Sequence, residues 1–99
     1  MKTGTVELGN ASLYLSYSQV VKPNQRGFAR EITEFGVPEE HRGKGEGTKL
    51  LEAVCEQADD EKILLLLIAD NVRLATFYAR HGFKVIQETP MLMARSPLA

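Results

Sequence analysis

Three glycines at alternate positions, Gly43, Gly45 and Gly47, join a strand-like segment to an amphipathic one. Glycines let a backbone turn sharply with no Cβ in the way, so successive N–H groups can point into one concavity. The start of the following helix adds N–H groups without intrahelical partners and a partial positive charge. Such a loop is suited to a phosphate or pyrophosphate, and Arg42 and Lys44 can add charge-assisted contacts.

Two common nucleotide-binding patterns do not fit this spacing. The P-loop requires Ser or Thr directly after Gly-Lys, whereas Gly45 follows Lys44 here. The dinucleotide fingerprint requires two residues between its second and third glycines, and only Glu46 separates Gly45 from Gly47. The loop therefore predicts a different phosphate-bearing ligand.

Residues 37–51 resemble the acetyl-CoA loop of the Gcn5-related N-acetyltransferase family, Gln/Arg-x-x-Gly-x-Gly/Ala, through Arg42, Gly45 and Gly47. A second family motif is similar to a downstream segment, in which Asn71 is followed by Tyr78 and then by Gly82-Phe83. The two segments are separated by an amphipathic stretch and an apolar one. The resemblance covers roughly residues 28–95.

The resemblance implies how acetyl-CoA, the co-substrate, would bind. The backbone of Phe35 and Val37 would hold the pantetheine arm as an added strand, and the amides of residues 43–48 would hold the pyrophosphate. Asn71 would contact the cofactor near its thiol end. The cofactor-binding residues implied in this way are Phe35, Val37, Arg42, Gly43, Lys44, Gly45, Glu46, Gly47, Thr48 and Asn71.

The resemblance also implies direct acetyl transfer to a deprotonated primary amine, in which Tyr78 protonates the departing CoA thiolate. A phenol with a pKa near 10 is protonated at pH 7 and can give its proton to a developing thiolate. Glu34 is the candidate base, directly or through a water, ahead of Glu31. The structural alternatives are a core role for Tyr78, which lies on an apolar helix stripe, and simple solvent exposure for Glu34.

Hydrophobic periodicity gives the elements that must position these residues. Strands are expected at 5–8 and 13–18 around a Gly9-Asn10 turn, and a long strand at 28–37, after a turn-rich loop at 22–27. In that long strand the alternation of side chains between the two faces shifts near residues 33–36. This shift predicts a β-bulge, which Gly36 would tolerate. Helices at 47–59 and 72–81 alternate with strands at 62–69, 83–87 and 91–95.

This order predicts a single α+β domain over residues 1–99, with the acyl-CoA N-acyltransferase fold that the resemblance implies. Its sheet is expected to be central, mixed and mostly antiparallel, with two main helices packed on it. The strand at 62–69 is apolar from Ile63 onward, so we expect it to be covered on both faces.

Composition limits the remaining classes of function. The chain has 99 residues, 43% hydrophobic and 25% charged, with a net charge of −1, so no overall field attracts nucleic acid or a membrane. Its longest apolar run is far shorter than the about 20 residues that span a bilayer. Cys55 falls on the buried stripe of a helix, and His41 and His81 lack partners at metal-ligand spacing. We expect a cytoplasmic protein without a metal.

Two departures from the family pattern affect the functional expectation. Glu46 stands where the family has an apolar residue, so its carboxylate must face solvent or find a partner. Only 27 residues precede Phe28, and they show no sign of the two acceptor-side helices that the family has there. This predicts an open acceptor side, suited to a lysine or N-terminus on a protein, or a homodimer that completes the site.

The alternative function is a catalytically silent acyl-CoA-binding or protein-interaction module. The basic residues near the C-terminus are expected on a solvated face: Arg73, Arg80, Lys84 and Arg95.

Overall fold

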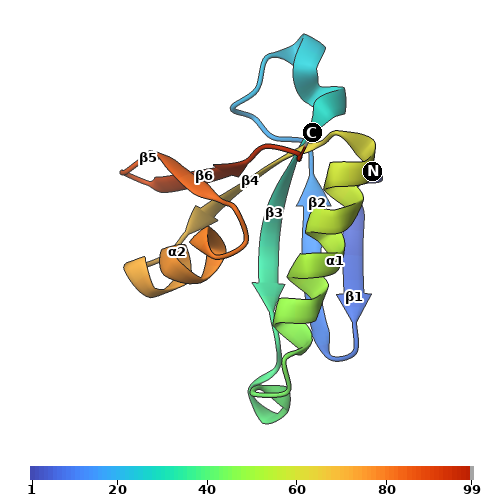
Figure 1. The fold of residues 1–99 in the computed structure, drawn as a ribbon, viewed down its shortest axis with the longest axis vertical. Coiled ribbons are helices and arrows are strands. Elements are labelled where there is room, and N and C mark those ends of the chain that lie inside the picture. Colours follow the sequence, from blue (N-terminus) through green and yellow to red (C-terminus); the bar gives the residue numbers. More distant parts are fainter. Residues whose placement is uncertain (99) are drawn as a thin grey trace.

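The computed structural model describes residues 1–98, and at Pro23 and Gln25 it describes the backbone alone. In chain order the elements are β1 (Gly4–Leu8), β2 (Ala11–Ser16), the 3-10 helix η1 (Pro23–Phe28), β3 (Ala29–Gly36), the 3-10 helix η2 (Glu39–His41), α1 (Glu46–Glu61), β4 (Leu64–Ala69), α2 (Val72–Ala79), β5 (Lys84–Gln87) and β6 (Met91–Arg95) (Figure 1). Every expected helix and strand is present, with boundaries that differ by up to two residues. Within residues 1–98 no helix combines the length and apolar character needed to cross a membrane.

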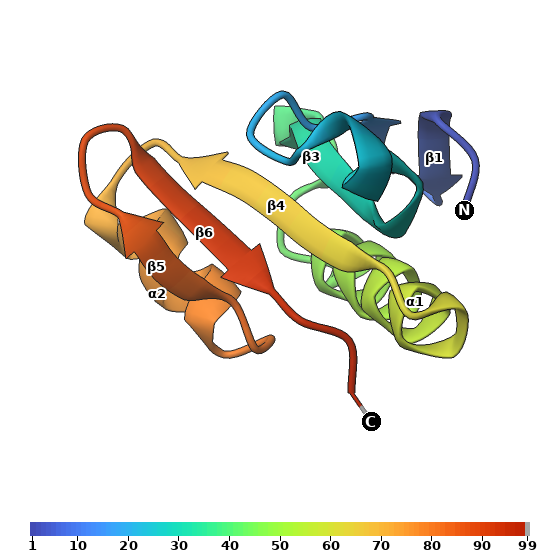
Figure 2. The ribbon, with the colours of Figure 1, turned by 90° about the horizontal axis from the view of Figure 1, so that it is seen from above.

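The strands form one six-stranded sheet in the order β1-β2-β3-β4-β6-β5. All neighbouring pairs are antiparallel except β3 and β4, which are parallel. A parallel pair needs a crossover connection, and α1 supplies it. The structure thus confirms the expected α+β fold with a mixed, mostly antiparallel sheet and two main helices (Figure 2).

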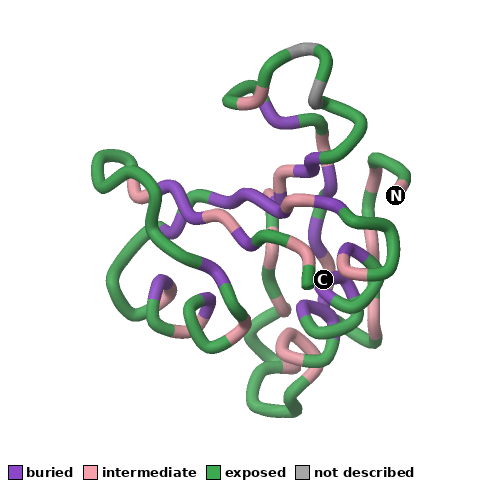
Figure 3. The backbone as a smooth tube through the Cα atoms, turned by 45° about the horizontal axis from the view of Figure 1, so that its top comes forward, coloured by how far each residue is buried: buried purple, intermediate pink, exposed green. Residues whose placement is uncertain are grey.

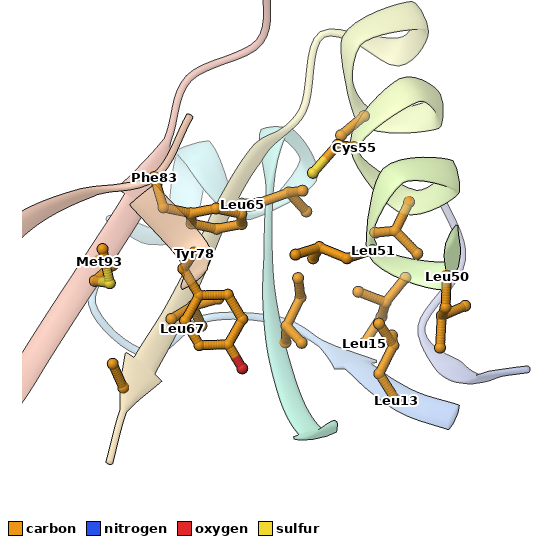
Figure 4. Close-up of a cluster of buried hydrophobic side chains, with 14 of the residues drawn as sticks. Leu13, Leu15, Leu50, Leu51, Cys55, Leu65, Leu67, Tyr78, Phe83 and Met93 are labelled. Carbon is orange, nitrogen blue, oxygen red and sulfur yellow. The ribbon is translucent and has the colours of Figure 1, made fainter. Parts of the chain in front are cut away.

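The core lies between the sheet and both helices. Alternate residues of the strands point into it, among them Leu13, Leu15, Ile32, Leu65, Leu67 and Met93. From the helices come the predicted stripe of α1 and, from α2, Ala75 and Tyr78 (Figures 3 and 4). Cys55 belongs to that stripe, and burial raises its thiol pKa to about 11, so it is a core residue and no nucleophile at neutral pH.

The opposite face of the sheet carries no α-helix among the described residues. On this face of β4, Leu66 is buried but Ile68 is 49% exposed. The expectation that β4 is covered on both faces is therefore wrong at its carboxyl end. Tyr14, on the same face of β2, is exposed as well.

The expected bulge is present in β3. Ser12 and Tyr14 of β2 stand opposite Gly36 and Thr33, so β3 contains one extra residue over this interval. Glu34 rather than Gly36 takes the left-handed conformation, with φ 52°. Such a conformation costs a residue with a side chain about 1–2 kcal/mol. The extra residue brings Phe35 and Val37 onto the core side that already holds Ile32.

The pairing of β3 with β4 is short. Only Ala29, Arg30 and Glu31 pair with Leu64, Leu65 and Leu66, and beyond these residues the two strands diverge (Figure 1). The facing edges of their carboxyl-terminal halves therefore have no strand partner among the described residues. The two strands open like a V toward the start of α1 and the start of α2.

Arg95 lies at the end of β6 and joins three elements. Its guanidinium is 8% exposed and donates to the Asp59 carboxylate at 2.7 and 2.9 Å, while its Nε donates to the His81 carbonyl at 2.8 Å. Asp59 also accepts the Leu98 amide. The expectation that Arg95 belongs to a solvated basic face is therefore wrong.

Asp59→Asn should lower the free energy of unfolding by about 1–3 kcal/mol at pH 7, because Arg95 would lose its charged partner. The Arg95 hydrogen bonds lower the pKa of Asp59 below its usual 3.8. A lowered pKa means that the contribution is present above pH 3.8 and is lost as pH falls through the folded-state pKa. Urea unfolding of both proteins across this range should show the difference shrinking with acid; a constant difference would contradict the ion-pair account.

Candidate functional site

The diverging strands border a cavity of about 750 Å³. It is lined by the loop after β3 and the first turn of α1, the carboxyl-terminal halves of β3 and β4, and one face of α2. This volume lies in the range of small-molecule and cofactor sites. Every candidate site residue named from the sequence lines it except Asn71: Glu34, Phe35, Val37, Arg42, Gly43, Lys44, Gly45, Glu46, Gly47, Thr48 and Tyr78.

The loop has the geometry that its glycines predict. Gly43 and Gly45 have φ 84° and 77°, and a Cβ at either position would meet no heavy atom within 4 Å. Gly45 is the N-cap of α1, and no side chain caps this end of the helix. The first N–H groups of α1 have no intrahelical partner and are left for a ligand. The loop thus presents unpaired donors, which together with the helix dipole favour an anion.

Arg42 and Lys44, the two basic side chains of the loop, make different contacts. Arg42 donates from Nε to the Val37 carbonyl at 3.0 Å, which fixes the chain where β3 leaves the sheet. Lys44 lies with its Nζ 3.3 Å from His41 Nδ1 and is exposed. Both positive charges therefore lie at the mouth of the cavity beside the helix start.

Gly47 is needed for packing rather than for an unusual conformation. A Cβ there would lie 3.3 Å from Val37 Cγ2 and 3.7 Å from the Phe35 ring. The start of α1 consequently lies directly against the end of β3.

Glu46 has a partner in the structure. Asn10, in the turn between β1 and β2, donates to its carboxylate from the backbone N–H at 3.1 Å and from Nδ2 at 3.2 Å. The Asn10 side chain, followed by its backbone N–H, lowers the pKa of Glu46. Gly9 makes this approach possible, because any Cβ there would overlap the Glu46 carboxylate. This hydrogen-bonded carboxylate anchors the glycine loop to the hairpin turn.

Tyr78 lies on α2 among aromatic rings, with centroids 5.4 Å from Phe77, 5.8 Å from Phe83 and 6.2 Å from Phe35. It is 7% exposed, yet it lines the cavity, and within the described residues its hydroxyl makes no hydrogen bond (Figure 4). Burial, followed by the nearby charge of Asp70, raises its pKa. The phenol is therefore protonated at neutral pH and has a free donor in the cavity.

Asn71 lies outside the cavity lining, whereas Glu34 belongs to it. The Asn71 side-chain oxygen accepts the Leu74 amide at 2.9 Å and caps α2, outside the cavity lining. An Asn at this position is therefore explained by helix capping. Glu34 is exposed on the bulge and lines the cavity.

Sequence reasoning missed several lining residues, chiefly Asp70, Phe77 and Leu74. Asp70 directly follows β4. Its position at the carboxyl end of a central strand is the signal that could have identified Asp70 as a cavity residue. Among the described residues no group of three His, Cys, Asp or Glu side chains could hold a metal ion.

Comparison with known proteins gives a consistent assignment. Residues 5–85 match a family model described as an acetyltransferase (GNAT) domain. The chain is 36% identical over 60 residues to the uncharacterized N-acetyltransferase YobR of Bacillus subtilis, a match of 58% of this chain and 24% of that protein. The chain thus spans about a quarter of the length of this curated relative.

Solved structures share the fold at low identity. The GNAT family N-acetyltransferase YhbS of Escherichia coli, in complex with CoA, superposes with a TM-score of 0.66 and 13% identity, covering 87% of this chain and 51% of that one. The anti-CRISPR protein AcrVA5 superposes with a TM-score of 0.68 and 18% identity, covering 95% of this chain and 98% of that one.

Asn10→Ala should raise the pKa of the Glu46 carboxyl toward its ordinary value, because the largest stabilising contact of the carboxylate is lost. NMR titration of the side-chain carboxyl measures this directly. Lys44→Gln is the matched control, since its charge acts on Glu46 more weakly than the Asn10 hydrogen bonds. A larger rise with Lys44→Gln would mean that the loop charge, and not the hairpin, controls Glu46.

Proposed function

Because this chain belongs to the Gcn5-related N-acetyltransferase (GNAT) family, we propose that it transfers an acetyl group from acetyl-CoA to a primary amine. One observation carries the proposal: a single cavity is lined both by an uncapped helix start suited to an anion and by Tyr78, whose side chain is largely buried and whose hydroxyl has no hydrogen-bond partner among the described residues. An anion site alone would fit many ligands. A proton donor in the same cavity suits chemistry on that ligand.

The shape of the cavity supports acetyl-CoA as co-substrate. The open amides of residues 43–48, with Arg42 and Lys44, suit a pyrophosphate. The unpaired edge of β3 at Phe35 and Val37 suits the amide-containing pantetheine arm, which can add to it as a strand does. The CoA complex of YhbS, which shares this fold, is consistent with the assignment.

Asn71 is not part of this proposed contact set. Its side-chain oxygen is used in capping α2, so its contribution is to fix the start of the helix that carries Tyr78. Asn71 would therefore position the proton donor rather than touch the co-substrate.

The proposed reaction is a direct transfer. The amine nitrogen attacks the thioester carbonyl carbon, a C–N bond forms, and the C–S bond breaks with its electron pair going to sulfur. Tyr78 gives its hydroxyl proton to that sulfur, and the phenolate recovers a proton from solvent. Glu34, on the bulge beside the cavity, takes the proton that the amine loses, directly or through a water.

Acetyl-CoA should raise the thermal midpoint of the protein, whereas ATP and NAD should not. A ligand at 100 times its dissociation constant stabilises by about 2.7 kcal/mol. For a domain of this size that corresponds to a shift of roughly 10 °C or more. Differential scanning fluorimetry measures the shift, and no shift at millimolar acetyl-CoA would overturn the assignment of the co-substrate.

Tyr78→Phe should lower kcat by about 100-fold or more while the dissociation constant of acetyl-CoA changes little, because only the proton donor is removed. Tyr17→Phe is the control, since Tyr17 lies beneath the Arg30 guanidinium and does not line the cavity. Steady-state kinetics with titration of acetyl-CoA separates the two effects. Unchanged turnover would remove Tyr78 from the mechanism, and binding without turnover in the wild-type protein would favour a silent acyl-CoA-binding module.

A further inference from the structure

The charges that line the cavity are divided between its two ends. The basic residues, Arg42 and Lys44, both lie in the loop before α1, and the one acid beside them, Glu46, is held by Asn10. Beyond the loop the lining contains three carboxylates, Glu31, Glu34 and Asp70, and no Lys or Arg. One end of the cavity therefore suits an anion and the other a cation.

The three carboxylates come from separate places in the fold. Glu31 is the last residue of β3 that pairs with β4, opposite Leu66, and it lies on the sheet face that no α-helix of the described residues covers. Glu34 lies on the bulge, and Asp70 follows the end of β4. They thus border the V between the two strands on both sides, and Glu31 lies on the uncovered face, from which a second substrate can approach.

The nearest buried cation does not neutralise them. Arg30 adjoins Glu31 in sequence but is 6% exposed and donates to the carbonyl oxygens of Met1, Arg26 and Ala29. It also stacks on Tyr17, and it is not part of the cavity lining. The negative charge at this end of the cavity is therefore free to act on a ligand.

Tyr78, the proposed proton donor, lines the cavity together with these carboxylates. Its side chain is more than nine-tenths buried and lines the cavity, and its hydroxyl makes no hydrogen bond within the described residues. Burial, and after it the charge of Asp70, raises the pKa of Tyr78, and both residues line the cavity. Tyr78 and the three carboxylates therefore line the same cavity, outside the glycine loop.

We propose that the acceptor is a cationic aliphatic amine with no carboxylate nearby: an alkylammonium group with further positive charge around it, recognised by Glu31, Glu34 and Asp70. This inference rests on the proposed acetyl transfer and specifies its second substrate. Carboxylates favour an ammonium group through Coulomb attraction and disfavour an acceptor that brings its own carboxylate. A lysine side chain in a basic protein segment and a free polyamine share this chemistry.

A competition assay tests the acceptor class. Three N-terminally blocked peptides of equal length each carry one central lysine, flanked by arginine, by alanine or by aspartate, and spermidine represents the free polyamines. The ratio of kcat/KM for the arginine-flanked over the aspartate-flanked peptide, measured by mass spectrometry, should be at least about tenfold, as a difference of about 1.4 kcal/mol would give. The rate with spermidine relative to the arginine-flanked peptide distinguishes a small polyamine from a protein lysine.

Variants connect the selectivity to the named carboxylates. Asp70→Asn and Glu31→Gln should each move the ratio toward one, mainly by raising KM for the arginine-flanked peptide. Glu56→Gln is the control, because it makes the same change in net charge on the exposed side of α1 and should leave the ratio unchanged. Retention of the thermal shift with acetyl-CoA shows that each variant is folded and still binds the co-substrate.

The outcomes separate this inference from the proposed function. Equal rates for arginine- and aspartate-flanked peptides, or a ratio that neither Asp70→Asn nor Glu31→Gln changes, would overturn the recognition by these carboxylates. Stabilisation by acetyl-CoA with acetylation of the aspartate-flanked peptide alone would overturn the acceptor class and leave the proposed acetyl transfer intact. Absence of stabilisation by acetyl-CoA would instead overturn the proposed function on which the inference rests.

Discussion

The short parallel pairing of β3 with β4 is the constraint on which the rest of the structure depends. Three residue pairs hold the two halves of the sheet together, and the strands then diverge. Because the pair is parallel, α1 must cross from the end of β3 back to the start of β4, which places its N-terminus at the open end of the V. The cavity, the unpaired backbone edges and the anion site therefore have a single geometric origin.

Local features adapt the chain to that divergence. The bulge at Glu34 turns Phe35 and Val37 toward the core, although the left-handed backbone there opposes folding. Gly47 lets α1 lie against the strand that it has just left. On the other side of the V, the packing of Tyr78 against Phe83 and the burial of Arg95 hold α2, β6 and the end of α1 together. The Arg95–Asp59 pair thus links the two halves of the sheet near the paired start of β4, and the cavity lies where the strands diverge.

The sequence was sufficient for the features that periodicity and motif spacing encode. The buried stripe of α1, the hairpin turn at Gly9-Asn10, the bulge in β3 and the glycine loop were all expected from local pattern. What could not be predicted depends on residues far apart in the chain. Glu46 meets Asn10 36 positions away, and Arg95 meets Asp59 at the same separation, so no local window contains either pair. Asp70 was missed because its place in the cavity lining depends on which strand neighbours β4, and the capping of α2 by Asn71 was not foreseen beside the ligand contact that the family resemblance implies.

The Glu46 carboxylate shows how one distant contact can decide the electrostatics of a site. The protein has a net charge of −1, so no overall field separates anionic from cationic ligands. The separation arises locally. The backbone N–H and the side-chain amide of Asn10 both donate to the Glu46 carboxylate, which holds this carboxylate toward the hairpin turn. Arg42, Lys44 and the start of α1 then dominate one end of the cavity, while the carboxylates of β3 and β4 dominate the other. The two-ended site proposed for a polyanionic donor and a cationic acceptor therefore depends on the hydrogen bonds between Glu46 and Asn10 as well as on the choice of charged residues.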